Sequence, residues 1–313
     1  MPIAVRASQL THRYGERTAL DHLDLEIERG ELFAILGPNG GGKTTFFRLL
    51  STLIPIQSGR LEILGHDASS RAADVRSSLG VVFQAPSLDR KLTVSENLRH
   101  QGPLYGLSGQ RLREAHDRML GRLGLTDRAG DLVETLSGGL RRRVELAKGL
   151  LHSPPVLILD EPSTGLDPGA RSDLWNYLRE IRDRDGVTVI LTTHLLEEAD
   201  KVDRLAILDH GRLVAIDTPD ALRATVGGDT LTLEADNPSE LASAIRSTFA
   251  LPATVVEGSV RLEVPNAHAI VARLIEALPA GRIRALTLRK PTLEDVFIAR
   301  TGHRFWAAGA ADG

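Results

Sequence analysis

The residues with the clearest chemical potential lie in one glycine-rich stretch, Gly37–Thr44. It fits the pattern G-x-x-x-x-G-K-[ST], which is typical of a loop that holds nucleotide phosphates. Glycines let such a loop fold into a concave nest whose N–H groups point at a polyanion. We expect Lys43 to reach the β- and γ-phosphates and the Thr44 hydroxyl to ligate Mg²⁺. The alternative is a glycine-rich turn that binds nothing.

Two adjacent acids, Asp160 and Glu161, end the apolar stretch that begins at Val156. The continuous apolar run is typical of a parallel strand that is covered on both faces. If the strand geometry persists, the two side chains point to opposite sides. Asp160 could then face a metal while Glu161 faces a water molecule. The alternative is a pair of surface acids at a strand end.

Two polar residues follow other apolar stretches, Gln84 after Val81–Phe83 and His194 after Val187–Leu191. In a chain of strand–helix units, functional residues gather at the carboxyl ends of the strands. Taken singly, Gln84 is better interpreted as an ordinary loop residue, and a lone histidine at a strand end as a structural one.

A second stretch of small residues, Leu136–Gly139, precedes a helical pattern. Ser137 there could be a plain N-cap that satisfies free helical N–H groups. Alternatively, Ser137, Gly138 and Gly139 leave room for a phosphate at the helix N-terminus. Tyr14 is expected on a loop ahead of the phosphate-binding stretch, where it could pack in a turn or stack on adenine.

Regular elements must bring these residues together. The apolar run Leu32–Leu36 predicts a buried strand before the phosphate-binding stretch. Thr44–Leu50 predicts a helix whose positive N-terminal end faces the phosphates. Ile3–Leu10 and Leu20–Ile27 predict two strands, and the second alternates like a half-buried antiparallel strand.

A helical lobe is expected at about residues 90–150. A capping box at Thr93–Glu96 opens it, and the pattern stays helical to about Leu125. Residues 204–216 predict a hairpin of two short strands.

The C-terminal part has a different pattern of predicted strands and helices. Gly227-Gly228 marks the expected boundary between a first domain, residues 1–226, and a second, residues 227–303. The sequence of the second domain predicts the element order βαββαβ, which suggests a small ferredoxin-like fold. The Ala- and Gly-rich end, residues 304–313, is expected to be a disordered tail.

Composition narrows the range of functions. The chain has 313 residues, of which 42% are apolar, enough for about two packed domains. Its formal net charge of −3 gives no indication of nucleic-acid binding, and the absence of cysteine excludes disulfides and thiol chemistry. The N-terminus lacks a signal-peptide layout, and no apolar run approaches the ~20 residues that cross a bilayer. We therefore expect a soluble, cytoplasmic chain.

In combination and order, these motifs resemble the ATP-binding cassette (ABC) family over residues 1–225. The signature loop discriminates, because other phosphate-loop ATPases lack it. The resemblance rests on the Walker A loop (Gly37–Thr45), the Q-loop glutamine (Gln84), the signature loop (Leu136–Gly139), Walker B (Val156–Asp160) with Glu161 after it, the D-loop (Ser163–Asp167), the H-loop histidine (His194) and the aromatic A-loop position (Tyr14).

The resemblance implies an α/β fold. This is a P-loop NTPase cassette with an antiparallel β subdomain and a helical lobe, followed by a small α+β, ferredoxin-like C-terminal domain. The implied residues that bind ATP are Tyr14, Gly37, Asn39, Gly40, Gly41, Gly42, Lys43, Thr44, Thr45, Ser137, Gly138 and Gly139. The implied catalytic residues are Lys43, Gln84, Glu161 and His194, and the implied ligands of Mg²⁺ are Thr44, Gln84 and Asp160.

The implied reaction is MgATP hydrolysis by in-line attack of water. Glu161 would orient and deprotonate the water, and His194 would contact the γ-phosphate. Gln84 would sense the γ-phosphate and Mg²⁺ and report to a membrane partner. Ser137 and Gly139 would complete the ATP site of a second copy, which gives a head-to-tail dimer with two shared sites.

Three less specific stretches are similar to the ATPase subunits of ABC-2 type exporters, which include drug-resistance pumps. They are Phe83–Asp89, Gly139–Arg143 and Pro291–Phe297. This similarity implies a separate multi-spanning permease, a position on the inner face of the cell membrane, and export of a drug, lipid or polysaccharide-like substrate. Gly41 stands where the Walker A loop of the family often has alanine. Leu140 departs from the usual glutamine and forfeits one polar contact.

The sequence leaves two alternative functions, both less favoured. A soluble cassette ATPase in DNA repair or translation usually carries two cassettes, coiled-coil inserts or basic arms. This chain has one cassette and a mildly acidic balance, which favours the exporter. A regulatory protein with an inactive cassette is disfavoured because Lys43, Asp160, Glu161 and His194 are intact.

Overall fold

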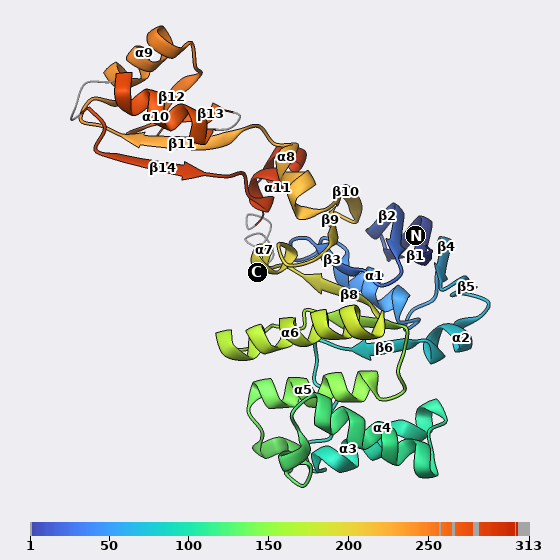
Figure 1. The fold of residues 1–313 in the computed structure, drawn as a ribbon. Helices are drawn as coiled ribbons and strands as arrows, with labels where there is room; N and C mark the ends of the chain where they lie inside the picture. Colours follow the sequence, from blue (N-terminus) through green and yellow to red (C-terminus); the bar gives the residue numbers. More distant parts are fainter. Residues whose placement is uncertain (1, 257, 265–266, 278–281, 304, 306–313) are drawn as a thin grey trace. The chain divides into compact units, whose positions relative to one another are not determined.

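The computed structural model describes residues 2–256, 258–264, 267–277, 282–303 and 305 (Figure 1). The chain divides into two compact units between Thr218 and Pro219. The boundary expected from the sequence, between residues 226 and 227, falls a little further along and stays a prediction.

A six-stranded sheet forms the centre of the first unit. Its order is β10-β9-β3-β8-β7-β6, and all neighbours are parallel except the β9–β10 pair. β3, β7 and β8 are buried along their whole length, as expected of parallel strands covered on both faces. The strands are β3 (Leu32–Leu36), β6 (Leu79–Val82), β7 (Val156–Asp160), β8 (Thr188–Thr193), β9 (Arg204–Asp209) and β10 (Arg212–Asp217).

An antiparallel sheet in the order β2-β1-β4-β5 lies beside this central sheet. The alternation predicted for the second strand is confirmed, because Leu23, Leu25 and Ile27 are buried and the residues between them are not. The strands are β1 (Ile3–Tyr14), β2 (Arg17–Glu28), β4 (Ser58–Ile63) and β5 (His66–Asp67).

The prediction that Tyr14 lies on a loop is wrong. Tyr14 is the last residue of β1 and pairs with Arg17 across a tight turn. Gly15 adopts the left-handed backbone conformation in that turn, with φ 59°. The hairpin therefore keeps both residues in extended strands.

The helical lobe contains α3 (Val94–Gln101), α4 (Gly109–Arg122) and α5 (Gly138–Leu150), which lie together in the green part of Figure 1. The capping box is confirmed: the Glu96 N–H donates to Thr93 Oγ1, and the Thr93 N–H donates to the Glu96 carboxylate. The continuous helical pattern expected up to Leu125 is interrupted after α3. Pro103 opens a 3₁₀ turn there, and Gly106, with φ 73°, closes it.

Helices cover the central sheet. They are α1 (Lys43–Leu50), α2 (Ala72–Ser77), α6 (Pro168–Asp185) and α7 (Leu196–Ala199). α1 packs Phe46 and Phe47 into a core that also holds Phe33 and Ile190 of the sheet. This packing holds α1 against the sheet.

The second unit has the predicted βαββαβ order, and its antiparallel sheet runs β12-β13-β11-β14. This is the strand order of a ferredoxin-like domain. α9 and α10 pack on one face of the sheet, over Leu231, Leu233 and Leu262 (Figure 1). The elements are α8 (Pro219–Ala224), β11 (Asp229–Glu234), α9 (Pro238–Phe249), β12 (Ala253–Val256), β13 (Ser259–Val264), α10 (Ala267–Ala277), β14 (Ala285–Arg289) and α11 (Leu293–Thr301).

Within the expected tail, residues 304–313, only Phe305 is among the described residues. It is buried and packs edge-to-face on Phe297, with ring centroids 4.9 Å apart. The prediction of disorder for the other tail residues lies outside the described part of the chain.

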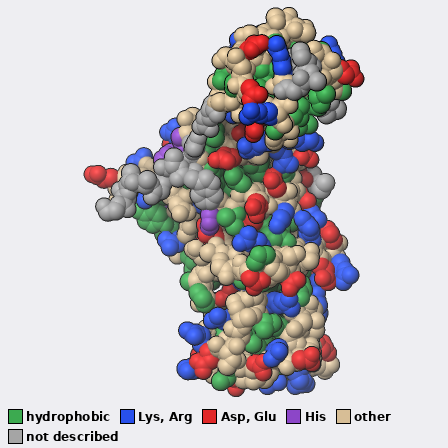
Figure 2. Space-filling view, turned by 90° about the vertical axis from the view of Figure 1, so that its left-hand side faces the viewer, with side chains coloured by type: hydrophobic (Ala, Val, Ile, Leu, Met, Phe, Trp, Pro, Cys, Tyr) green, Lys and Arg blue, Asp and Glu red, His purple; other side chains and the backbone are tan. Residues whose placement is uncertain are grey.

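Two surface properties bear on partners. None of the helices in the described part of the chain is both long and apolar enough to cross a membrane. On the face shown in Figure 2, basic and acidic side chains are interspersed, in keeping with a net charge of −3.

Candidate functional site

A cleft of about 460 Å³ lies at the carboxyl ends of β3, β7 and β8. It brings together most residues that the sequence singled out, although they come from distant parts of the chain. The lining residues predicted from the sequence are Tyr14, Asn39, Gly40, Gly42, Lys43, Thr44, Thr45, Gln84, Glu161 and His194. Two lining residues that the sequence reasoning missed are Arg17 and Ala19, and a third, Thr164, lies within the D-loop stretch Ser163–Asp167.

The glycine-rich loop turns tightly between β3 and α1. The Gly41 N–H donates to the Pro38 carbonyl at 3.1 Å, and the Gly211 N–H donates to the Gly41 carbonyl at 3.1 Å. Gly42, the N-cap of α1, has φ 105°, a conformation that L side chains rarely adopt. The loop is therefore held by its own backbone and by the turn between β9 and β10.

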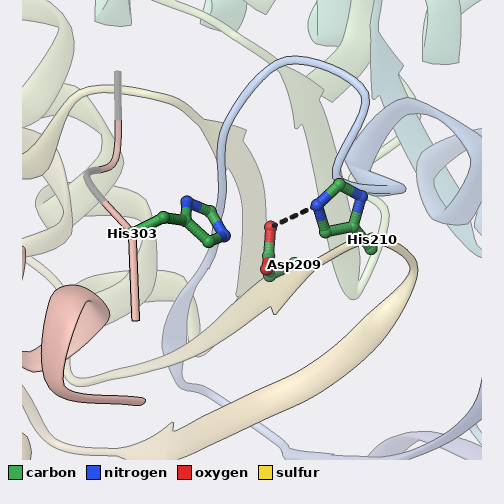
Figure 3. A group of neighbouring side chains, drawn as sticks. All are labelled: Asp209, His210 and His303. Atoms are coloured by element: carbon green, nitrogen blue, oxygen red, sulfur yellow. Dashed lines mark ion pairs between the residues drawn. The ribbon is translucent and has the colours of Figure 1, made fainter. Parts of the chain in front are cut away.

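His210 lies in that second turn, next to Asp209, the last residue of β9 (Figure 3). The His210 Nε2 atom is 3.9 Å from Asp209 Oδ1. The predicted hairpin is confirmed, and it supports the glycine-rich loop through Gly211.

Substitution of Gly42 by alanine is expected to lower the free energy of unfolding by about 1–3 kcal/mol. A Cβ atom at Gly42 would lie 2.7 Å from the Ala19 carbonyl oxygen and 3.0 Å from a Leu20 methyl, on a backbone with φ 105°. Urea denaturation measures the change. Gly121→Ala is the matched control, because this helical glycine has open space around its Cβ position and should tolerate alanine. Equal stability of both variants would contradict the strain assigned to Gly42.

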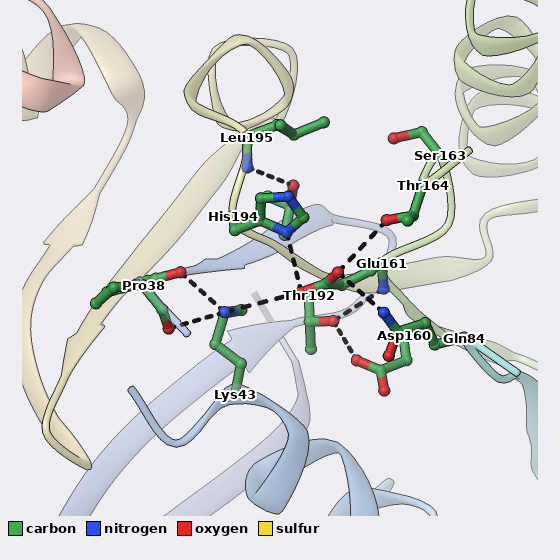
Figure 4. A network of polar contacts seen from close by, with 12 residues as sticks. Pro38, Lys43, Gln84, Asp160, Glu161, Ser163, Thr164, Thr192, His194 and Leu195 are labelled. Carbon is green, nitrogen blue, oxygen red and sulfur yellow. Dashed lines mark hydrogen bonds and ion pairs between the residues drawn. The ribbon is translucent and has the colours of Figure 1, made fainter. Parts of the chain in front are cut away.

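Lys43 lies at the base of the cleft with only 4% of its surface exposed. Its ammonium donates to the Gly37 carbonyl at 2.8 Å and to the Pro38 carbonyl at 3.0 Å (Figure 4). Burial lowers the pKa of Lys43, while the charges of Glu161 and Asp160 act in the opposite direction. The ammonium has three donors, so one remains for an anion in the cleft.

Glu161 is the point at which the other side chains converge (Figure 4). One carboxylate oxygen lies 3.1 Å from His194 Nδ1 and 3.9 Å from Lys43 Nζ. The other accepts from Gln84 Nε2 at 3.3 Å and from the Thr164 hydroxyl at 3.4 Å. The carboxylate is thus oriented by four polar groups.

The strand geometry that would send Asp160 and Glu161 to opposite sides does not continue through Glu161. β7 ends at Asp160, and Glu161 has φ 43°, in the left-handed region. Its N–H donates to Thr192, at 3.0 Å to the hydroxyl and 3.2 Å to the carbonyl. A turned backbone therefore directs Glu161 into the cleft.

Asp160 is buried behind the cleft, with 5% of its surface exposed, and does not line it directly. It accepts a hydrogen bond from the Thr192 hydroxyl at 2.5 Å. Burial raises the pKa of Asp160, and the Thr192 hydrogen bond opposes this shift. A divalent cation nearby would stabilise the buried carboxylate. Oxygens of Thr44, Gln84 and Asp160 are donors of the kind that Mg²⁺ prefers, so this set fits a magnesium ion.

Ser137, Gly138 and Gly139 are not part of the cleft lining. Ser137 is the N-cap of α5 and accepts from the Leu140 N–H at 3.3 Å, so the plain capping role is confirmed. Gly139 packs closely on α6, because a Cβ there would lie 2.7 Å from that of Ala170. A second anion site at this helix end stays a prediction.

A buried carboxylate that the sequence reasoning missed connects two loops of the site. Glu198, 1% exposed, accepts hydrogen bonds from the hydroxyls of Ser163 and Thr193. Thr193 precedes His194, and Ser163 lies two positions after Glu161. No local pattern indicates this contact, because it depends on how the loops after β7 and β8 meet.

Two family models match complementary parts of the chain. The model described as "ABC transporter" matches residues 20–164, and "ATP-binding protein DrrA1-3-like, C-terminal domain" matches residues 218–301. A third model, "AAA domain, putative AbiEii toxin, Type IV TA system", matches residues 132–200.

Curated relatives align over almost the whole chain. The chain is 39% identical to the daunorubicin resistance ATP-binding protein DrrA2 of Streptomyces coeruleorubidus, over 96% of each chain. It is 34% identical to the linearmycin resistance ATP-binding protein LnrL of Bacillus subtilis, over 95% of this chain and 98% of the relative. It is 38% identical to the Nod factor export ATP-binding protein I of Sinorhizobium fredii, over 96% of this chain and 86% of the relative.

Solved cassette structures match most of the chain. CbiO1 of Clostridium perfringens, part of the ABC transporter complex cbiONQ, superposes with a TM-score of 0.67 at 28% identity, covering 80% of this chain and 97% of that one. A dimeric post-hydrolysis state of the ATP-binding cassette MJ0796, bound to ADP and Pi, superposes with a TM-score of 0.62 at 27% identity, covering 68% of this chain and 98% of that one.

Proposed function

The chain belongs to the ABC transporter family as an ATP-binding ATPase subunit, and we propose that it powers export through a separate membrane permease. The observation that carries the proposal is the extent of the similarity. Relatives named for drug resistance or Nod factor export align over 95–96% of this chain, including the C-terminal unit. We propose a drug, lipid or polysaccharide-like molecule as the exported substrate.

In the proposed reaction, water attacks the γ-phosphate of ATP in line, and the protein contributes positioning and charge stabilisation. Lys43 and the loop N–H groups hold the β- and γ-phosphates. Glu161 orients the water and accepts its proton, in a carboxylate held by four neighbours. His194 contacts the γ-phosphate. Tyr14, exposed at the rim of the cleft, stacks on the adenine.

We propose that Mg²⁺ accompanies the nucleotide. Thr44, Gln84 and Asp160 would hold it, and when bound it supplies charge stabilisation to the phosphates. Gln84 also donates to Glu161 at 3.3 Å. A shift of Gln84 on metal and phosphate binding would therefore alter the orientation of the catalytic carboxylate.

We propose that two copies assemble head-to-tail, each supplying its signature loop to the other's ATP. Ser137 and Gly138 are exposed and lie outside the cleft of their own chain. An exposed helix N-terminus can bind a phosphate of a second copy's ATP. The solved cassette bound to ADP and Pi is itself described as dimeric.

The permease would hold this subunit at the inner face of the membrane. We propose a groove of about 260 Å³ beside the Gln84 segment as its contact. Leu53, Phe83 and Tyr105 line the groove, and Leu53 is 57% exposed. Since Phe83 precedes Gln84 directly, a partner here would contact the segment that senses the nucleotide.

Affinity purification from detergent-solubilised membranes tests this function. The tagged chain is expected to recover a multi-spanning membrane protein. Recovery of ribosomes or DNA instead would contradict the proposal and support the alternative role in translation or DNA repair.

Two matched variants test where the permease binds. Leu53→Glu is expected to lose the membrane protein, because it places a charge in the proposed contact. Leu132→Glu changes a leucine that is 39% exposed elsewhere in the helical lobe, and it should retain the partner. If both variants retain the membrane protein, the permease does not bind at this groove.

A further inference from the structure

Side chains of α5 hold both ends of the segment that contains Gln84. At its start, Arg142 Nη1 donates to the Phe83 carbonyl at 3.0 Å. At its end, the Ser87 N–H donates to Glu145 at 3.1 Å, and Lys148 Nζ donates to the Ser87 carbonyl at 2.6 Å. The segment is therefore attached to one face of a single helix.

Arg142 also contacts the loop that carries Glu161. Arg142 Nε donates to the carbonyl of Pro162, the residue after Glu161, at 2.7 Å. Arg142 is 8% exposed, and its charge is paired with buried Glu145 at 2.6 Å. A buried arginine with this pairing stays in one place, and its planar guanidinium has donors at fixed angles.

One guanidinium thus links the residue before Gln84 to the residue after Glu161. Between these two carbonyls, the Gln84 side chain donates to the Glu161 carboxylate at 3.3 Å. Arg142 therefore ties the two loops together just beyond the paired ends of β6 and β7. A small misplacement of reacting groups has a large kinetic cost, about 100-fold for an error near 1 Å.

We propose that Arg142 is a positioning residue for ATP hydrolysis, which transmits the state of the signature loop to Gln84 and Glu161. This rests on the function proposed above. Ser137, at the N-terminus of α5, would contact the ATP of the second copy, and Arg142 lies just over one turn along the same helix. Movement of this helix on closure is carried to both loops through one side chain.

The test compares steady-state ATPase kinetics of Arg142→Gln with Arg143→Gln. Arg143 makes the same change of charge on the same helix, but its partners are Asp173 and the Tyr177 ring on α6. For Arg142→Gln we expect kcat to fall about tenfold or more with KM for ATP nearly unchanged, because the Lys43 loop is untouched. Arg143→Gln is expected to keep kcat within about twofold.

A further pair of variants separates positioning from folding. Arg142→Gln alone leaves Glu145 buried without its cation, so Arg142→Gln/Glu145→Gln removes both charges together. Thermal unfolding and the affinity for MgATP should stay near those of the natural chain, while kcat remains low. Arg142→Lys keeps the positive charge but lacks the rigid planar fork of donors, so it should recover only part of kcat.

The outcomes distinguish this inference from the function on which it rests. If the natural chain hydrolyses ATP and the double variant matches its kcat, Arg142 does not position the site. A parallel loss of MgATP affinity and thermal stability would also overturn the inference, because it would show a structural role. If the natural chain itself neither hydrolyses ATP nor dimerises with it, the proposed function fails instead.

Discussion

Replacement of Glu161 by glutamine is expected to lower kcat for ATP hydrolysis by about 10²–10⁴-fold while leaving ATP binding intact. Glutamine keeps the shape of the side chain and an oxygen that can accept from Gln84 and Thr164. It cannot accept a proton from water. In the proposed dimer hydrolysis releases the closed form, so the variant should also accumulate as an ATP-bound dimer.

Steady-state ATPase assays and light scattering with MgATP measure both effects. Glu197→Gln is the matched control, since it makes the same change on an exposed carboxylate a few residues from His194. It should hydrolyse ATP normally. Unchanged turnover in Glu161→Gln would show that the proton acceptor is another group.

Replacement of Lys43 by methionine is expected to weaken MgATP binding by about 10–100-fold, the contribution of charge-assisted hydrogen bonds to a phosphate. Methionine fills similar space but has no donor. The variant also leaves the Gly37 and Pro38 carbonyls without their ammonium partner, so some loss of stability should accompany it.

Titration with a fluorescent ATP analogue measures the affinity, and thermal unfolding without nucleotide measures the stability. Lys91→Met is the control. Lys91 is exposed, pairs with Glu134 and does not line the cleft. Tight binding of MgATP by Lys43→Met would refute the role assigned to this ammonium.

The fold could be predicted best where one local signal dominates. Leu32–Leu36 is a strand with the predicted ends, because a continuous apolar run suits a strand that is buried on both faces. The strand predicted from Val156 is also present, but it stops at Asp160, before the second acid. The helix pattern after Thr93 was harder to delimit. Its amphipathic spacing continues through Pro103 and Gly106, which break the backbone without breaking the pattern.

Motif spacing predicts most of the residues that line the cleft, but not their geometry, and the predicted residues Ser137, Gly138 and Gly139 are not among the lining residues. Lys43, Gln84, Glu161 and His194 meet in one cleft because their strands are parallel neighbours. The contacts of Arg142 and Glu198 depend on how loops from different strands meet, which no local pattern encodes. An arginine three positions before a glutamate on an apolar helix face was the available signal for the first of them.

The left-handed backbone of Glu161 has a consequence for the evolution of this chain. A residue with a β-carbon is less stable in that conformation by about 1–2 kcal/mol, a penalty that glycine avoids. Substitution of Glu161 by glycine would therefore relieve this strain and remove the carboxylate at the same time, so stability and turnover make opposing demands on this position. Keeping the acid at this position requires continued selection for turnover.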